Sequence, residues 1–204
     1  MFFSIALPLI VIAANVWTYR IYQTSILMLL LLVAQTITLF VILIKKHIKI
    51  LYAPLFVLFV LYSLVQFKEF TLSTIIKVDS SPEVMEIELR QPYYRTELNW
   101  VYWNRYGKRY FDDIKPIFDK YTIRLYSGLD LTRYFGDYRI IFFPLFVLGL
   151  ISLLKTSNRF MLIFFLLSFL AQGLFQIREG TGYVYYYPII NATVAYGIYK
   201  ILKR

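Results

Sequence analysis

The sequence predicts an all-α fold, that of a polytopic membrane protein with about six transmembrane helices and a helical, aromatic-rich exoplasmic segment between the third and the fourth. Hydrophobic residues make up 59% of the 204 residues, whereas globular proteins contain about half. The polar residues form one block, because 11 of the 12 acidic residues lie between Glu69 and Asp137. We therefore expect a membrane domain of three helices over 1–67, an exoplasmic interfacial segment over 68–139 and a membrane domain of three helices over 140–204.

Three apolar runs precede the polar block: Phe2–Trp17, Thr24–Ile44 and Ile50–Phe67. The second run is the clearest span, because a helix needs about 20 apolar residues to cross a hydrocarbon core. The first run begins without the Lys or Arg that a signal peptide carries, so we expect an uncleaved span. Pro54 lies near the start of the third run, where a membrane helix tolerates it.

Three further runs follow the block: Ile140–Leu154, Phe160–Gln176 and Tyr183–Ile201. A short polar turn from Lys155 to Arg159 separates the first two of these runs. We expect those two helices to form an antiparallel hairpin. Asn15, Gln35, Gln172 and Asn191 are the most polar residues within the runs, and interhelical hydrogen bonding is the usual role of such side chains.

The basic residues of the short loops predict the topology. Two of them, Arg20 and Arg178, fall on one side of the membrane, and eight fall on the other. Those eight are Lys45, Lys46, Lys49, Lys155, Arg159, Lys200, Lys203 and Arg204. By the positive-inside rule, both termini are expected in the cytoplasm and residues 68–139 outside the cell membrane. The net charge of +10 is thus explained by lipid headgroups as partners, and we expect no nucleic-acid binding.

The polar block is predicted to be helical and to lie along the membrane surface. Ser81 followed by Pro82 is a helix-start signal, and Pro92 is expected to end that helix near Arg90. Aromatic residues are dense from Tyr93 to Tyr138 and alternate with Arg and Lys. Such residues bind sugars or phosphates in some proteins, but we favour an interfacial belt for most of them.

No complete active site is visible in the sequence. Cysteine is absent and His47 is the only histidine, so we expect no thiol nucleophile, no catalytic triad and no metal site. The adjacent pair Asp112 and Asp113 would diverge by about 100° on a helix and share no metal. The residues themselves predict no cofactor.

Four short motifs carry a resemblance to a known family. They are Asn104-Arg105, the run Leu129-Asp130-Leu-Thr-Arg-Tyr-Phe-Gly-Asp137, the span Phe143–Leu150, and Arg178 followed by Tyr183-Val-Tyr-Tyr-Tyr-Pro188. Over roughly residues 90–204, the chain resembles the carboxy-terminal half of polytopic GT-C glycosyltransferases, which use dolichyl-phosphate or polyprenyl-phosphate sugar donors. The resemblance implies that Arg178, with Tyr183, contacts the carrier phosphate at the exoplasmic face.

The family's catalytic carboxylate lies in its first exoplasmic loop, and the corresponding loop here, Thr18–Gln23, contains no Asp or Glu. The resemblance therefore implies a truncated relative that lacks the catalytic first half and is non-catalytic or partner-dependent. The resemblance also implies that such a relative handles a polyprenyl-phosphate-linked glycan and takes a polyprenyl-phosphate lipid as its possible cofactor. Residues expected to contact a glycan or a partner are Tyr94, Trp100, Trp103, Asn104 and Arg105.

Two alternatives stay open. In the first, the chain is a membrane scaffold or assembly subunit that docks another membrane protein through residues 68–139, because exposed aromatic residues and arginines anchor interfaces. In the second, it is a minimal glycosyltransferase whose catalytic carboxylate is Asp130 or Asp137. Asp130 and Asp137 are thus the catalytic candidates, and nothing in the sequence decides between the two alternatives.

Overall fold

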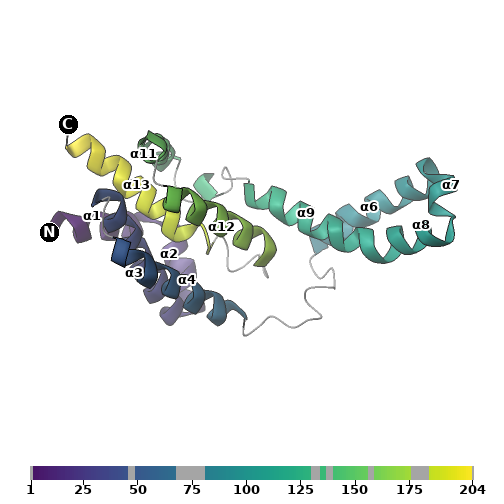
Figure 1. Ribbon diagram of the computed structural model, residues 1–204, viewed down its shortest axis with the longest axis horizontal. Helices are drawn as coiled ribbons and strands as arrows, with labels where there is room; N and C mark the ends of the chain where they lie inside the picture. The colour runs from purple at the N-terminus through teal and green to yellow at the C-terminus, as the bar shows by residue number, and fades with distance from the viewer. Residues whose placement is uncertain are drawn as a thin grey trace.

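The computed structural model describes residues 2–45, 49–67, 81–129, 134–136, 140–155, 159–175 and 184–203, and every regular element in these ranges is helical (Figure 1). The predicted all-α class is therefore confirmed. One group of helices forms a bundle: α1 (Phe2–Ala14), α2 (Val16–Thr24), α3 (Ile26–Ile44), α4 (Tyr52–Phe67), α11 (Phe142–Lys155), α12 (Arg159–Phe175) and α13 (Tyr187–Leu202). The other group comes from the polar block: α6 (Ser81–Glu97), α7 (Asn99–Tyr102), α8 (Arg105–Arg109), the π-helical turn η2 (Tyr110–Ile114) and α9 (Lys115–Leu129).

Helix α13 forms the centre of the bundle. Its residues from Tyr187 to Gly197 are all buried, and it packs against α11, α3 and α1. Pro188 lies in the first turn, where a proline without an N–H removes no intrahelical hydrogen bond. A helix that is apolar on all sides belongs in the interior of a bundle, and α13 occupies that place.

Two glycines allow α11 and α13 to cross closely. A Cβ atom on Gly149 would overlap the carbonyl oxygen of Thr193, and a Cβ atom on Gly197 would overlap the carbonyl oxygen of Leu145. The backbone of the opposite helix thus lies where the side chain of each glycine would be. Small residues permit this kind of close helix contact.

The first apolar run is interrupted at Asn15, where the sequence predicted one continuous span. Helix α1 ends at Ala14, and the Asn15 side chain caps α2 by accepting a hydrogen bond from the Trp17 N–H at 2.9 Å. The amide Nδ2 of Asn15 donates to the Tyr134 hydroxyl at 2.9 Å and to Asn191 Oδ1 at 3.0 Å. Buried polar groups require partners, so the break is stabilised by the contacts that join α1, α13 and Tyr134. The expected interhelical bonding of Asn15 and Asn191 is confirmed.

Helix α12 packs on α4 and α9, and the predicted close pairing with α11 is wrong. Tyr52 stacks on Phe160 with ring centroids 3.8 Å apart, and Phe59 meets Phe164 at 5.5 Å. Helix α9 is the main backbone neighbour of α12 among the described helices. The side of α11 that carries Gly149 is already occupied by α13, so α12 finds its partners elsewhere.

The apolar helices differ in length. Among the described helices, α3 with 19 residues is the one that is both long and apolar enough to cross a hydrocarbon core. The stretches Tyr52–Val65, Phe142–Lys155 and Phe160–Gln172 are apolar but shorter. Helix α1 has 13 residues, because the Asn15 break divides the first run.

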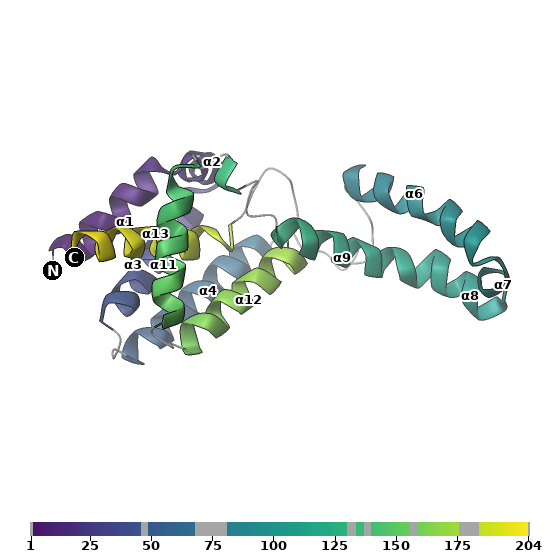
Figure 2. The same ribbon diagram turned by 90° about the horizontal axis from the view of Figure 1, so that it is seen from above.

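The polar block forms a long helical hairpin. Helix α6 runs beside α8, η2 and α9, α7 makes the turn between them, and the hairpin extends away from the bundle (Figure 1, Figure 2). The start at Ser81 is confirmed, but the predicted end near Arg90 is wrong, because α6 continues through Pro92 to Glu97. Pro92 and Glu88 are both exposed, so the Glu88 carbonyl that loses its hydrogen bond can contact water. The hairpin projects from the bundle (Figure 1), and its predicted position along a membrane surface stays a prediction.

Candidate functional site

The residues expected to contact a glycan or a partner separate into two places on the hairpin. Trp103, Asn104 and Arg105 are exposed at the turn between α7 and α8, and Trp103 is 64% exposed. Asn104 also has a structural role, because its side chain accepts the Tyr106 N–H and caps α8. Tyr94 lies away from this turn and is half-buried between α6 and α9.

Several expected site residues lie outside the part that the structure describes. They are the catalytic candidates Asp130 and Asp137, and the carrier-phosphate residues Arg178 and Tyr183. Trp100 belongs to α7, but its side chain is likewise outside the described part. The proposed sugar chemistry of these residues therefore stays a prediction.

A buried carboxylate that the sequence pattern does not single out joins the two helices of the hairpin. Asp119 on α9 is 2% exposed. It accepts hydrogen bonds from the Tyr94 hydroxyl at 3.1 Å and from the Lys115 ammonium group, and Arg90 Nη1 lies 3.6 Å from its Oδ1 atom. Charge-assisted hydrogen bonds of this kind are the strong ones. Tyr94 and Arg90 come from α6 and Lys115 from α9, so Asp119 holds α6 against α9.

The charge state of Lys115 follows from its surroundings. Partial burial lowers the pKa of Lys115, but the hydrogen bonds to Asp119 and Tyr94 and the negative charge of Asp119 outweigh this effect, so the pKa lies above its ordinary value of 10.5. The Lys115 ammonium group also lies 5.4 Å from the centre of the Tyr94 ring, a cation–π distance. Lys115 therefore stays positively charged at neutral pH.

One signal in the sequence pointed to this cluster. Lys115 and Asp119 are four positions apart, the spacing of neighbours on a helix surface. The sequence does not show that Tyr94 and Arg90 of another helix lie against that pair, because this depends on how the hairpin closes.

The outer surface of the hairpin carries two stripes of exposed apolar side chains. The stripe on α6 consists of Met85, Leu89 and Tyr93, which are 65%, 68% and 60% exposed. The stripe on the returning helix consists of Tyr106, Tyr110, Ile114 and Phe118, which are 81%, 42%, 54% and 64% exposed. A spacing of four residues keeps the members of a stripe on one side of their helix.

Both stripes lie on the same side of the hairpin. On α6, Leu89 and Tyr93 each precede a residue that faces the other helix, since Arg90 and Tyr94 contact Asp119. On the returning helix, Tyr110, Ile114 and Phe118 precede the inward residues Phe111, Lys115 and Asp119. On a helix, the side chain of the preceding residue points about 100° away from that of the inward residue. Because the two helices run in opposite directions (Figure 2), these offsets bring both stripes to one side, which we call the apolar face of the hairpin.

The composition of the apolar face is that of a protein interface. Aromatic residues and Met are enriched in interface cores, and this face has four aromatic residues, one Met and no charged residue among its seven members. Residues 81–129 contain eight basic and seven acidic residues, so the hairpin is close to neutral. An interfacial helix that binds anionic lipids carries an excess of Lys and Arg, which this hairpin does not have.

Comparisons with known proteins supply no relative for this chain. No protein-family model, no curated protein and no solved structure matches it.

Proposed function

We propose that this chain is a polytopic protein of the cell membrane that serves as an assembly subunit, docking another protein through the apolar face of its exoplasmic hairpin. The observation that carries the proposal is the apolar face itself. Its Leu89 and Ile114 side chains are 68% and 54% exposed, and a large, one-sided apolar patch on a hairpin marks an interaction site. Two antiparallel helices with one shared apolar face are completed by a further helix or helical hairpin.

The outer surface of the bundle supports the membrane assignment. Large apolar side chains are exposed around α3, α4, α11 and α12: Ile26, Leu27, Leu30, Phe56, Val57, Val60, Leu61, Leu64, Phe143, Leu148, Ile151, Leu154, Leu162, Ile163, Leu166, Leu167 and Leu170. In water such a surface would cause aggregation, whereas lipid tails are its natural solvent. Helices of 14–17 residues, such as α11, α4 and α12, fit a membrane that thins locally around the protein. We propose that both termini are cytoplasmic and residues 68–139 exoplasmic.

The partner is a protein that presents an apolar helical surface. A photo-crosslinking amino acid at Leu89 or Ile114 is expected to give a covalent adduct with a protein in intact cells, because these side chains lie at the centre of the apolar face. The adduct is identified by mass spectrometry of the purified product. A mass of two chains identifies a second copy as the partner, and a tryptic map of any other adduct identifies a different protein.

Asp113 is the matched control position for this experiment. It is exposed and directly precedes Ile114, but it points about 100° away around the helix. The same amino acid at Asp113 is expected to give little adduct. Equal adduct yields at Asp113 and Ile114, or adducts with lipid alone, would contradict docking through the apolar face.

A second candidate function is the handling of a polyprenyl-phosphate-linked glycan. The exposed pair Trp103 and Arg105 at the end of the hairpin favours it, because an indole ring stacks on sugars and a guanidinium group binds phosphate. Arg178 is the residue proposed to hold the carrier phosphate.

Native mass spectrometry of the gently solubilised protein tests the glycan-handling candidate. If it is right, the protein retains a polyprenyl phosphate, and Arg178→Ala loses that lipid while the fold is kept. Arg20→Ala is the control, because it removes a cation from the same predicted side of the membrane. A lipid that Arg178→Ala retains in full would rule out the proposed role of Arg178.

A further inference from the structure

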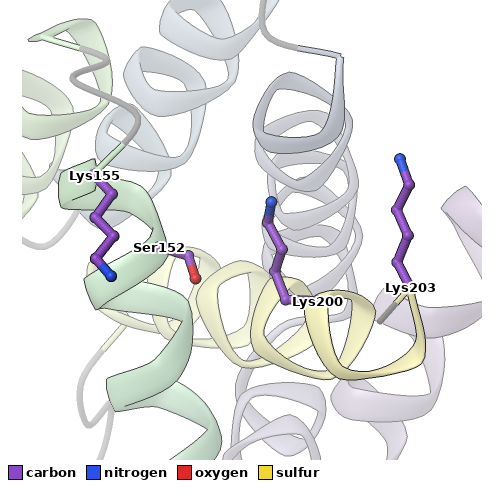
Figure 3. Close-up of a pocket in the computed structure, with 4 residues that line it drawn as sticks. All are labelled: Ser152, Lys155, Lys200 and Lys203. Atoms are coloured by element: carbon purple, nitrogen blue, oxygen red, sulfur yellow. The ribbon is translucent and has the colours of Figure 1, made fainter.

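A basic hollow of about 420 Å³ lies between the C-terminal turns of α11 and α13. Ser152 and Lys155 line it from α11, Lys200 lines it from α13, and Lys203 lines it from the C-cap position of α13 (Figure 3). Two helices that are distant in the sequence thus line the hollow with one serine and three lysines. We propose that it is a binding site for a phosphate monoester.

In the described part of the chain, no acidic side chain forms an ion pair that neutralises the three lysines. Among the described residues none of the three forms an ion pair with a carboxylate, and the acidic residues of the sequence lie between Glu69 and Asp137 or at Glu179. Three like charges that share one hollow repel each other and destabilise the fold locally. A bound anion removes this repulsion, so the hollow is electrostatically complementary to a multiply charged ligand.

Aromatic rings hold two of the lysine side chains. The Lys200 ammonium group lies 5.3 Å from the centre of the Tyr196 ring, and the Lys203 ammonium group lies 5.7 Å from that of Tyr199. The Tyr196 and Tyr199 rings stack with centroids 6.3 Å apart. Cation–π contacts restrict the long, flexible lysine chains, so less conformational entropy is lost when a ligand binds.

A simpler explanation covers only part of this arrangement. Cations in the last turn of a helix interact favourably with its dipole, and Lys155 and Lys200 occupy the last turns of α11 and α13. Cytoplasmic loops also carry excess Lys. Neither effect requires the two helix ends to converge on a shared hollow, nor a hydroxyl donor such as Ser152 within it.

The ligand chemistry follows from the donor set. A phosphate monoester carries a charge of about −1.5 to −2 at neutral pH and three acceptor oxygens, which suits three ammonium groups and one hydroxyl. Lysine binds phosphate as a point charge. The phosphate can belong to the headgroup of a lipid such as phosphatidic acid or to a soluble molecule, since the hollow lies on the predicted cytoplasmic side.

Binding of radiolabelled inorganic phosphate to the full chain in phosphatidylcholine nanodiscs tests the site. The double variant Lys155→Gln/Lys200→Gln is expected to weaken binding by at least about tenfold, because two charge-assisted contacts are lost. Ser152→Ala keeps all charges and is expected to weaken it by about threefold. The control Lys45→Gln removes an exposed lysine of the same predicted side outside the hollow and is expected to leave binding unchanged.

Nanodiscs that also contain phosphatidic acid distinguish the two sources of phosphate. If the lipid is the ligand, phosphatidic acid displaces inorganic phosphate from the unaltered chain. If a soluble phosphate is the ligand, phosphatidic acid leaves its binding unchanged. Equal losses in Lys45→Gln and in the double variant would overturn the proposal, as would unchanged binding in the double variant.

Discussion

Replacing Gly149 or Gly197 by alanine is expected to destabilise the bundle by about 2 kcal/mol, since overpacking of a close contact typically costs about 1–3 kcal/mol. The added methyl group would meet a backbone carbonyl oxygen of the opposite helix, that of Thr193 or Leu145. A backbone atom cannot rotate away as a side chain can, so α11 and α13 would have to separate. Alanine favours a helix over glycine by about 1 kcal/mol, so the net loss of about 2 kcal/mol corresponds to a packing cost of about 3 kcal/mol, the upper end of that range.

Unfolding in mixed micelles, followed by tryptophan fluorescence, measures this effect. Gly136→Ala is the matched control, because a Cβ atom there meets nothing within 4 Å. Its stability is expected to equal that of the unaltered chain or to exceed it slightly. A Gly197→Ala variant as stable as Gly136→Ala would show that the two helices are not in close contact at this crossing.

Replacing Asp119 by alanine is expected to open the hairpin. The variant leaves the Tyr94 hydroxyl and the Lys115 ammonium group without their carboxylate, and loss of a hydrogen bond to a charged group costs about 1.5–3 kcal/mol. Arg90 contributes less, because its side chain is 40% exposed and solvent screens the pair. We expect faster amide hydrogen exchange in α6 and α9, with α11 and α13 unchanged.

Asp113→Ala provides the comparison for that experiment. Asp113 belongs to the same continuous helix and carries the same charge, but it is exposed. Its removal is expected to leave exchange in α6 at the original rate. If amide hydrogen exchange in α6 is equally slow in Asp119→Ala and Asp113→Ala, the buried carboxylate does not hold the hairpin closed.

The regular elements of this fold could largely be predicted from the sequence, but their partners could not. The apolar run ending at Ile44 became α3 with little change, because length and hydrophobicity define such a helix locally. The break at Asn15 depends on Tyr134 and Asn191, which are far away in the sequence. At Pro92 the sequence predicted a helix end that is not there. The helix α6 continues because the carbonyl group that loses its hydrogen bond to Pro92 is exposed and can contact water.

The candidate sites could be predicted less well than the fold. The density of aromatic residues was visible in the sequence. That Leu89 and Ile114 lie on the same side of the hairpin can be inferred only once the two helices are known to be antiparallel and Tyr94 and Lys115 are known to face inward. The spacing of Asp119 and Lys115 indicated a helix-surface pair, but the burial of Asp119 arises from packing against α6 and is not visible in the sequence. The hollow at Lys155 and Lys200 joins two helix ends that the sequence assigned only to the same side of the membrane.

The central position of α13 has a consequence for biosynthesis. The helices that surround it, α1, α3 and α11, are made before it, yet each packs on residues between Tyr187 and Gly197. A nascent chain that ends before Tyr187 therefore has helices whose packing surfaces are unfilled and a polar Asn15 whose Asn191 partner does not yet exist. The core of this protein is therefore completed only when α13, the last helix that the structure describes, has been synthesised.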